Sequence, residues 1–341
     1  MKAWIIDRIC DLTTESHPLK RVELPVPVPE EGELLIHVST CGVCHTEIDE
    51  IEGRTPPPVY PVVPGHQVVG TVEQARGTRS GIRQGDRVGV AWIYSACGTC
   101  QHCLSGNENL CADFLATGRD VNGGYAEYMV VPEKYAYPIP VSFTDTEAAP
   151  LLCAGAIGYR SVALAGMGSG KRIGLTGFGA SAHLVLKLIG YQYPQSEVYV
   201  FARSPEERAF ALELGAQWAG DTTERPPCLL DCIIDTTPVW APVVFALEWL
   251  APGGRLVINA IRKESTDKEY LASIDYSRHL WMEKEIKSVA NVTSGDVRSF
   301  IRIAAEMSLK PELEIYPFEN ANQAIIEIKQ RRIKGAKVLV V

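Results

Sequence analysis

The hydrophobic pattern of this 341-residue chain changes character near residue 150. Before that point, short runs in which apolar and polar residues alternate are separated by Pro and Gly. These runs cover residues 34–38, 68–72, 87–90 and 125–131. Because alternation with a period of two gives a strand one buried face, the runs predict an irregular, mostly β domain. Pro25, Pro27 and Pro29 predict an extended connector, since each ring fixes φ and removes an N–H donor.

From about residue 155 the pattern becomes strand, Gly-rich turn and helix. Strands are expected over 172–178, 198–202, 232–235, 255–260 and 286–290. The helices expected between them are one that carries Leu184, Val185, Leu188 and Ile189, and one over 205–214. Nearly continuous apolar strands between amphipathic helices predict a parallel sheet covered on both faces. Helices over 297–307 and 321–331 and a strand over 336–341 do not extend this alternation, and we expect this last segment to return to the first domain.

Length and composition restrict the class of protein. A chain of 341 residues favours two domains, and 46% hydrophobic with 22% charged residues is an ordinary globular balance. The net charge of −8 argues against nucleic-acid and anionic-membrane partners. The basic cluster at residues 329–334 is interpreted as a solvated helix end. No signal peptide and no membrane-spanning run are recognised, and ten cysteines then indicate metal binding or catalysis in a reducing cytoplasm.

Four cysteines stand close together in a loop-like stretch, in the spacing C-x2-C-x2-C-x7-C. They are Cys97, Cys100, Cys103 and Cys111. Four thiolates that converge on one ion close its coordination shell against water, which predicts a structural zinc site. An iron–sulfur cluster uses the same ligands and stays open as an alternative. A nucleic-acid-binding zinc module is rejected because the chain is acidic, and incidental cysteines do not account for this density.

Cys44, His66 and Cys153 form a second candidate set, within the segments CGVCHTE, PGHQVVG and LLCAGAIGY. Two sulfurs, one imidazole and an open fourth position are typical of catalytic zinc. Taken singly, Cys153 is equally a small core residue and His66 a hydrogen-bonding turn residue. Spacing alone does not join three such distant residues into one site.

Over essentially its whole length the sequence resembles the zinc-containing medium-chain alcohol dehydrogenases. The matching motifs are Gly42-Val43-Cys44-His45-Thr46, Gly65-His66 with Val69-Gly70, the four-cysteine stretch, Asn122-Gly123-Gly124-Tyr125, Cys153-Ala154-Gly155 and Gly177-Phe178-Gly179. The resemblance implies an α/β fold: a GroES-like, mostly β catalytic domain over residues 1–153 and 291–341, and a Rossmann doubly wound parallel-sheet domain over 154–290. Both zinc ions would belong to the catalytic domain.

The resemblance also implies roles for single residues. Cys44, His66 and Cys153 would ligate a catalytic zinc, and Thr46 would pass on the alcohol proton, although a helix N-cap is another interpretation of that threonine. Asp49 stands where many relatives have a proton-relaying His, and we hypothesise that it completes the relay.

Other positions that match the family vary in character. Glu47 keeps an acidic residue of the family, whereas Gln67 replaces one. Ile157 replaces a Thr beside the nicotinamide, and Trp92 matches an aromatic residue of the substrate pocket. Thr55 is smaller than the aromatic of some ethanol-preferring relatives, so a longer or aromatic aldehyde is expected to fit.

A Gly-rich turn follows the strand at 172–178 and opens a helix. Its core, GxGxxA, includes Gly177, Phe178, Gly179 and Ala180. Glycines let the backbone approach a pyrophosphate, and a helix N-terminus offers free N–H groups to it. This context predicts a dinucleotide-binding turn.

The end of the next strand bears on the choice of nicotinamide. Ala202 occupies the position where an acidic residue would bind the ribose of NAD, and Arg203 and Ser204 could hold the 2′-phosphate of NADP. NADP is therefore favoured over NAD, although Arg203 could also be only a solvated loop residue. His45 matches a family position that touches the pyrophosphate, and Lys337 lies near another such position.

The sequence therefore predicts a zinc-dependent, NAD(P)-dependent oxidoreductase of primary alcohols and aldehydes, with two zinc ions per chain, as a homodimer or homotetramer. Alternatives are a zinc-free quinone or enoyl reductase of the same superfamily and a non-catalytic nucleotide-binding redox sensor. Neither needs all three of Cys44, His66 and Cys153.

Overall fold

Two crossings of the chain, after Ala156 and after Asn291, divide the protein into two units. The computed structural model describes residues 1–330 and 335–341. Unit 1 is Met1–Ala156 with Val292–Val341, and unit 2 is Ile157–Asn291. The expected crossings were after residues 153 and 290.

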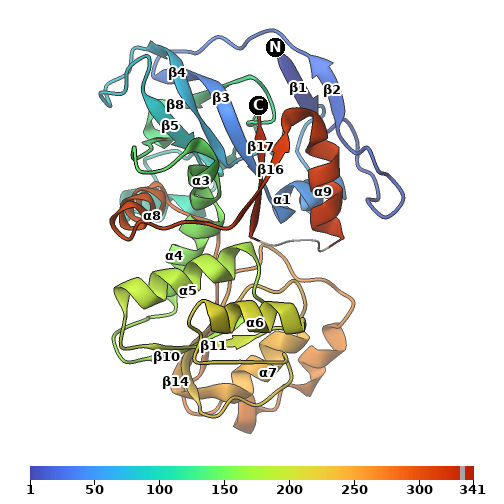
Figure 1. Cartoon of the computed structure of the whole chain (residues 1–341), viewed down its shortest axis with the longest axis vertical. Helices are drawn as coiled ribbons and strands as arrows, with labels where there is room; N and C mark the ends of the chain where they lie inside the picture. Colours follow the sequence, from blue (N-terminus) through green and yellow to red (C-terminus); the bar gives the residue numbers. More distant parts are fainter. Residues whose placement is uncertain (331–334) are drawn as a thin grey trace. The chain divides into compact units, whose positions relative to one another are not determined.

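Unit 1 is built on a seven-stranded sheet, counted over the described residues (Figure 1). Its path is β16 (Leu313–Pro317), β17 (Ala336–Val340), β3 (Glu33–Val43), β4 (Val68–Arg76), β5 (Arg87–Val90) and β9 (Ala136–Pro138), with β8 (Tyr128–Pro132) also paired to β3. The pairs are antiparallel except for β16 with β17. Leu34, Ile36 and Val38 alternate along β3 and are 0–1% exposed, so the predicted period of two gives the sheet its buried face.

The rest of unit 1 covers this sheet. Its other strands are β1 (Lys2–Ile5) with β2 (Lys20–Glu23), and β6 (Ile93–Ser95) with β7 (Leu115–Ala116). Its helices include α1 (His45–Ile51), α2 (Gln101–Leu104), α3 (Asp145–Ala148), α8 (Ser294–Glu306) and α9 (Ala321–Lys329), with short turns η1 (Glu108–Leu110), η2 (Glu133–Tyr135), η3 (Ala149–Leu152) and η6 (Phe318–Asn320). Residues 24–30, which contain the three prolines, form neither strand nor helix.

The prediction that the chain end returns to the first domain is confirmed, because β17 pairs with β3 and places Leu339 opposite Cys41. Strand β16, beside it, was not predicted, and its mixed burial leaves only a weak alternation. The predicted helix at 321–331 extends past α9, and residues 331–334, with most of the predicted basic cluster, lie outside the described residues.

Unit 2 contains a six-stranded parallel sheet within the described residues. Its order is β12 (Trp218–Gly220), β11 (Glu197–Phe201), β10 (Arg172–Thr176), β13 (Leu230–Asp235), β14 (Leu250–Ile258) and β15 (Glu285–Ser288). In β10 and β11 every residue after the first is buried. The prediction of a doubly wound parallel sheet is confirmed.

Helices cover this sheet: α5 (Ala180–Gln192), α6 (Pro205–Glu213) and α7 (Ala241–Trp249), and α4 (Ala154–Leu164) leads into the unit. Figure 1 shows α5 and α6 in front of the strands and α7 fainter, behind them. Turns η4 (Lys268–Ser273) and η5 (Tyr276–Leu280) precede β15. Helix α7 was not predicted, because most of its residues are buried and its sequence lacks a polar face. No helix in the described part of the chain has the length and apolar character needed to cross a membrane.

Candidate functional site

The second candidate set comes together in unit 1. Cys44 is the N-cap residue of α1, His66 lies just before β4, and Cys153 follows turn η3. One ligand atom from each lies within 4.8 Å of the other two. His66 and Cys153 are 22 and 109 positions from Cys44 in the sequence. They meet Cys44 in space because the elements that carry the three residues end at the same place. Two thiols and an imidazole at this spacing suit a tetrahedral ion with a fourth place for another ligand.

Glu47 orients the imidazole of His66 from behind. Its Oε1 lies 2.7 Å from His66 Nδ1, and its Oε2 accepts a hydrogen bond of 2.8 Å from the backbone N–H of Cys44. On the other side of the ring, His66 Nε2 lies 3.2 Å from Cys153 Sγ. A proton held at Nδ1 by the carboxylate leaves the Nε2 lone pair directed at the thiols, the tautomer that a metal requires.

The electrostatics of this group favour a bound cation. A hydrogen bond from Cys153 lowers the pKa of Cys44 well below its ordinary value, and the same contact raises the pKa of Cys153. Burial alone would lower the pKa of His66, but Glu47 and Cys44 raise it well above the ordinary range. Negative charge on Cys44 and Glu47 thus draws positive charge to the point where the three ligand atoms meet.

Thr46 and Asp49, both on α1, are buried. The Thr46 hydroxyl lies 3.5 Å from Cys44 Sγ. Since the N-cap of α1 is Cys44, capping does not explain Thr46. The Asp49 carboxylate accepts a hydrogen bond of 2.7 Å from Nε of Arg54, whose contribution the sequence did not suggest.

Glu50, one helical turn after Glu47, was also missed. It is 1% exposed, and neither of its carboxylate oxygens has a hydrogen-bond partner within the described residues. Burial raises the pKa of Glu50 well above its ordinary range. The spacing of three along a helix was the available signal, since it places Glu47 and Glu50 on one face.

Trp92, expected at the substrate pocket, packs at 5.5 Å on Phe114, and the guanidinium of Arg119 lies 5.5 Å above its ring. The hydroxyl of Thr55 is buried with no hydrogen-bond partner among the described residues. Gln67 is buried beside Gly42, where a Cβ would approach its side chain to 2.8 Å. Ile157 is the first residue of unit 2 and is half-buried.

The four-cysteine stretch forms a second cluster of potential metal ligands. All four Sγ atoms lie within 4.8 Å of one another, with Cys97 3.4 Å from Cys111 and 3.9 Å from Cys103. Backbone N–H groups, that of Thr99 foremost, lower the pKa of Cys97 to about 6, whereas burial raises that of Cys103 to about 12. A site with one ready thiolate among several thiols fits a metal that displaces the remaining protons.

Glu108 ties this cysteine stretch to helix α8. Its Oε1 accepts a hydrogen bond of 2.7 Å from the backbone N–H of Ser294, the first residue of α8, and its Oε2 accepts one of 3.1 Å from Lys134. A carboxylate at a helix N-terminus is favourably placed against the helix dipole. Glu108 therefore anchors the stretch to a rigid element of unit 1.

The Gly-rich turn lies in unit 2 between β10 and α5. Gly177 has φ +78°, and Gly179, the N-cap of α5, is exposed with open space where a Cβ would stand. Phe178 packs edge-on against Phe210 at 5.7 Å, so its side chain belongs to the core. The first amides of the 13-residue helix α5, from Ala180 on, have no intrahelical acceptor. These features leave room for a phosphate group at the turn.

The turn after β11 holds the residues expected at a ribose phosphate. Arg203 is exposed, and Ser204 is the N-cap of α6, where its Oγ accepts from Glu207 N at 3.2 Å and donates to Glu206. Arg208 lies under the same turn, because its Nη1 donates to the carbonyls of Ala202 and Arg203 at 2.8 and 2.9 Å. The sequence offered no signal for Arg208, since an Arg inside a helix is usually a solvated residue.

Lys337 and His45 differ in their surroundings. Lys337 is 2% exposed, and its ammonium contacts Glu314, Glu327 and the hydroxyl of Tyr316, so its charge is neutralised within unit 1. His45 is exposed at the start of α1.

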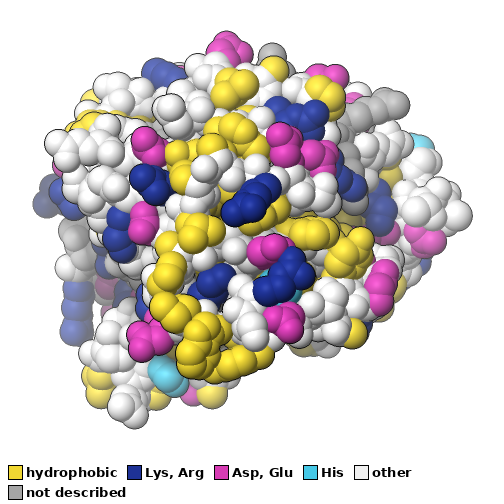
Figure 2. All heavy atoms as spheres, turned by 90° about the horizontal axis from the view of Figure 1, so that it is seen from below, with side chains coloured by type: hydrophobic (Ala, Val, Ile, Leu, Met, Phe, Trp, Pro, Cys, Tyr) yellow, Lys and Arg dark blue, Asp and Glu magenta, His cyan; other side chains and the backbone are white. Residues whose placement is uncertain are grey.

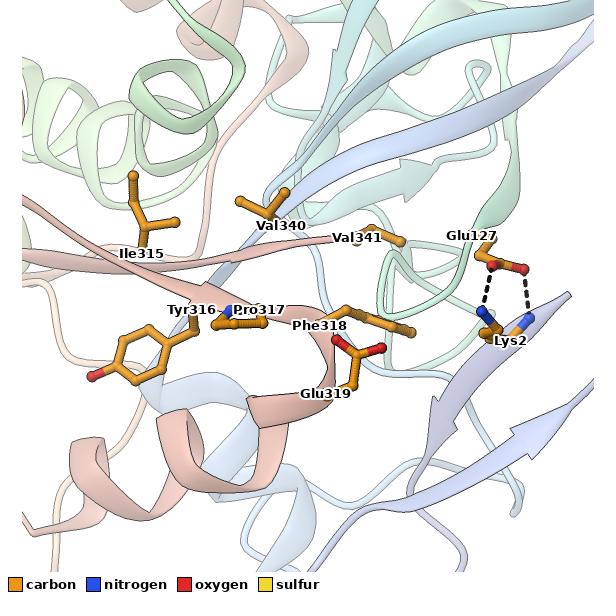
Figure 3. A pocket seen from close by; sticks show the side chains of 9 residues that line it. All are labelled: Lys2, Glu127, Ile315, Tyr316, Pro317, Phe318, Glu319, Val340 and Val341. Atoms are coloured by element: carbon orange, nitrogen blue, oxygen red, sulfur yellow. Dashed lines mark hydrogen bonds and ion pairs between the residues drawn. The ribbon is translucent and has the colours of Figure 1, made fainter.

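A cavity of about 590 Å³ in unit 1 contains none of the expected site residues (Figure 3). It lies between strands β16 and β17 and the Lys2–Glu127 pair, with Tyr316 and Phe318 on its wall. Among the described residues that line it there is no cysteine or histidine, so it is separate from both metal-ligand clusters.

Comparisons with known proteins agree with this arrangement. Residues 30–141 match the family described as alcohol dehydrogenase GroES-like domain, which confirms the predicted fold of the first unit. The chain is 41% identical, over its full length and 97% of the relative, to a probable alcohol dehydrogenase AdhA of Mycobacterium tuberculosis. Among solved structures, a cinnamyl alcohol dehydrogenase of Sorghum bicolor matches with a TM-score of 0.85 at 26% identity, covering 99% of this chain and 97% of that one. A cobalt- and zinc-bound alcohol dehydrogenase of Pyrobaculum aerophilum matches in fold with a TM-score of 0.87 at 24% identity, covering 100% and 99%.

Proposed function

Since the chain belongs to the zinc-containing medium-chain alcohol dehydrogenases and is an alcohol dehydrogenase, we propose that it interconverts primary alcohols and aldehydes at a zinc ion held by Cys44, His66 and Cys153. The convergence of these three ligand atoms within 4.8 Å carries the proposal. Zinc at this place would supply a Lewis acid for the substrate oxygen. The alcohol dehydrogenase of Pyrobaculum aerophilum, which shares this fold, has been solved with cobalt and zinc bound.

The residues around the proposed ion have separate tasks. Glu47 holds the proton of His66 Nδ1 and so keeps the ring aimed at the ion. Thr46 Oγ1, beside Cys44 Sγ, takes the proton of the alcohol hydroxyl. Asp49 completes the relay toward solvent, with Arg54 fixing its carboxylate. If an Asp49→Asn variant kept the pH–rate profile of the wild type, Asp49 would have no part in the relay.

We assign a second, structural zinc to Cys97, Cys100, Cys103 and Cys111. Four sulfurs leave no coordination place for substrate, so this ion would stabilise the fold and take no part in the reaction. Since every described cysteine is a free thiol and six of the ten lie in the two clusters, a reducing compartment such as the cytoplasm suits the protein.

For the hydride carrier we propose NADP in preference to NAD, bound to unit 2. The open approach at Gly179 and the amides of α5 suit its pyrophosphate. The absence of an acid at Ala202, together with the cationic Arg203 and Arg208 at the same turn, suits a 2′-phosphate. The negative charges of Glu206 and Glu207, in the first turn of α6, repel a 2′-phosphate. The positive charges of Arg203 and Arg208 therefore have to outweigh these two carboxylates.

A second copy of the chain is the partner we propose. β15 is an outer strand of the sheet in unit 2, and all four of its residues are exposed. Tyr276, Trp281, Met282 and Ile286, in or near it, are 45–62% exposed. Figure 2 shows hydrophobic side chains gathered in a curved band on the face seen from below. An outer strand with apolar neighbours is a template for pairing, and a twofold axis would pair β15 with its copy in a dimer.

Metal analysis with activity assays tests the function. Purified protein should contain two zinc ions per chain, and it should reduce a panel of aliphatic and aromatic aldehydes with NADPH. Cys153→Ser should lose one zinc and the activity, whereas Cys103→Ser should lose the other zinc and lower thermal stability. A zinc-free preparation with full aldehyde reductase activity would refute the proposal.

A further inference from the structure

A buried ion pair joins three strand ends in unit 2. Asp235, the last residue of β13, is fully buried, and its Oδ2 contacts the ammonium of Lys263. Its Oδ1 accepts hydrogen bonds from Thr176 Oγ1 at 2.5 Å and from Thr237 Oγ1 at 2.7 Å. Thr176 is the last residue of β10, and Lys263 follows β14. None of these residues has a part in the proposed chemistry.

Lys263 uses its remaining donors on backbone carbonyls. Its Nζ lies 2.7 Å from the carbonyl oxygen of Thr237 and 3.0 Å from that of Val239. An ammonium group has three N–H donors, so all of them are engaged inside the unit. Its side chain is only 7% exposed. The lysine therefore holds the loop after β13 and has no donor left for a ligand.

Two further contacts join the loop after β14 to the loop after β13. The backbone N–H of Glu264 donates to the carbonyl of Pro238 at 2.6 Å. The carboxylate of Asp267 accepts from the backbone N–H groups of Trp240 and Ala241, at 2.8 Å each, where α7 begins. The two loops thus form one connected wall at the carboxyl ends of β13 and β14.

This wall backs the Gly-rich turn. Thr236 donates to the carbonyl of Thr176 from both its backbone N–H, at 3.0 Å, and its hydroxyl, at 2.9 Å. A Cβ on Gly177 would stand 2.8 Å from Thr236 Oγ1 and 3.1 Å from Thr237 Cγ2. Gly177 therefore lies directly against the segment whose position Lys263 and Asp235 determine.

The strand order explains why the position of this wall matters for cofactor binding. From β10 the chain proceeds to β11 and β12 on one side and to β13 and β14 on the other. Dinucleotides bind at the carboxyl ends of strands where the order reverses in this way, here between β10 and β13. We propose that Lys263, paired with Asp235, is a positioning residue for the nicotinamide dinucleotide, because it holds residues 236–240 against the Gly-rich turn. The inference rests on the proposed dinucleotide cofactor.

Equilibrium binding without substrate tests it, with NADPH and NADH as probes and cofactor fluorescence as the readout. Lys263→Met should raise Kd for both cofactors at least about tenfold, as expected when charge-assisted bonds to a loop are lost. Lys284→Met is the matched control, because Lys284 also donates to two carbonyls of unit 2, those of Leu247 and Arg278, away from the turn. It should lower the melting temperature of the apo-protein but keep Kd within about twofold.

The Asp235→Asn/Lys263→Met double variant separates positioning from stability. Removing both charges avoids an unpaired buried carboxylate, so the melting temperature should recover relative to Lys263→Met. Kd should stay raised, because the hydrogen bonds from Lys263 to the carbonyls of Thr237 and Val239 are still missing. If Lys263→Met does not fold, the double variant alone tests the inference. Wild-type Kd in any folded Lys263 variant would overturn the inference. If the wild type bound neither cofactor, the proposed function would fail instead.

Discussion

The contact between Glu47 and His66 yields the sharpest test of the catalytic metal site. Glu47→Gln keeps the size of the side chain and an oxygen acceptor but removes its charge. The carboxylate is fully buried and has two contacts, one of 2.7 Å to His66 Nδ1 and one of 2.8 Å from the N–H of Cys44. We expect the variant to fold and to bind zinc more weakly at the site of Cys44, His66 and Cys153.

The magnitude follows from these two contacts. A hydrogen bond to a charged group contributes about 1.5–3 kcal/mol and a neutral one about 0.5–1.5 kcal/mol. Loss of the charge therefore costs about 1–2 kcal/mol, and each 1.4 kcal/mol corresponds to about a tenfold change in an equilibrium constant. Zinc affinity should fall roughly 5- to 30-fold, which overlaps the range found when partners of metal ligands are replaced.

Competition with a chromophoric zinc chelator measures this affinity, and kcat/KM with saturating zinc measures the effect on turnover. The chain offers a matched control in Glu50→Gln. Glu50 lies on the same helix, is equally buried and makes no hydrogen bond to the described residues. The reasoning is refuted if Glu47→Gln binds zinc as tightly as the wild type. It is also refuted if Glu50→Gln weakens binding equally, because the acidity of the helix would then matter and the contact to His66 would not.

Glu50→Gln has an outcome of its own in thermal melts. Burial raises the folded-state pKa of Glu50 above its unfolded value. Stability linked to this group is therefore complete below the unfolded pKa and is lost as the pH rises toward the folded pKa. The variant should melt at a higher temperature than the wild type at about pH 8, and the advantage should shrink toward about pH 4.

Three further outcomes follow from the structure. Arg203→Ala should lower the ratio of NADPH to NADH catalytic efficiency about tenfold, and an unaltered ratio in steady-state kinetics would contradict the assignment of NADP. Contact with Lys337 lowers the pKa of Glu327 to about 2, so its stabilisation is present above the unfolded value and lost as the pH falls through about 2. Urea unfolding should find Glu327→Gln about 1 kcal/mol less stable than the wild type at neutral pH. This figure is discounted because the Glu327 side chain is partly exposed. A difference in stability that persists at pH 2 would count against the Glu327–Lys337 pair. Light scattering should find Ile286→Lys monomeric if β15 forms the dimer contact, and an unchanged mass would exclude that strand.

Local sequence patterns were enough to predict most of the strands and several of the helices. Alternation with a period of two predicted the strands at β3, β4 and β5, and nearly continuous apolar runs predicted β10, β11 and β13. Helix α7 was not predicted, because it is buried on nearly all sides and its sequence therefore has no amphipathic period. Strand β12 was not predicted because it is too short to show a pattern. The tight cysteine spacing predicted one metal cluster from the residues alone.

The other cluster needed the family resemblance, since 22 and 87 residues separate Cys44, His66 and Cys153 and no periodicity relates them. Apart from Glu47, which the family resemblance had singled out, the charged residues that support the sites were not predicted. Lys263 and Asp235 are 28 positions apart, and Glu108 and Ser294 are 186 apart. A charged residue in a sequence is most often solvated, so only the tertiary structure distinguishes a buried partner from a surface one.

Three of the charged residues that support the sites share one property that explains their places. Glu47, Lys263 and Glu108 each use a charge to join a loop that carries a candidate site to a regular element: His66 to α1, residues 236–240 to β13, and the cysteine stretch to α8. Loops cannot hold ligand atoms to within tenths of an ångström by packing alone, because they bury little apolar surface. Such buried contacts are costly to break, because the removal of one partner leaves the other buried and unsatisfied. Replacing any of these three residues should therefore impair the site it supports more than its small share of the hydrophobic core would suggest.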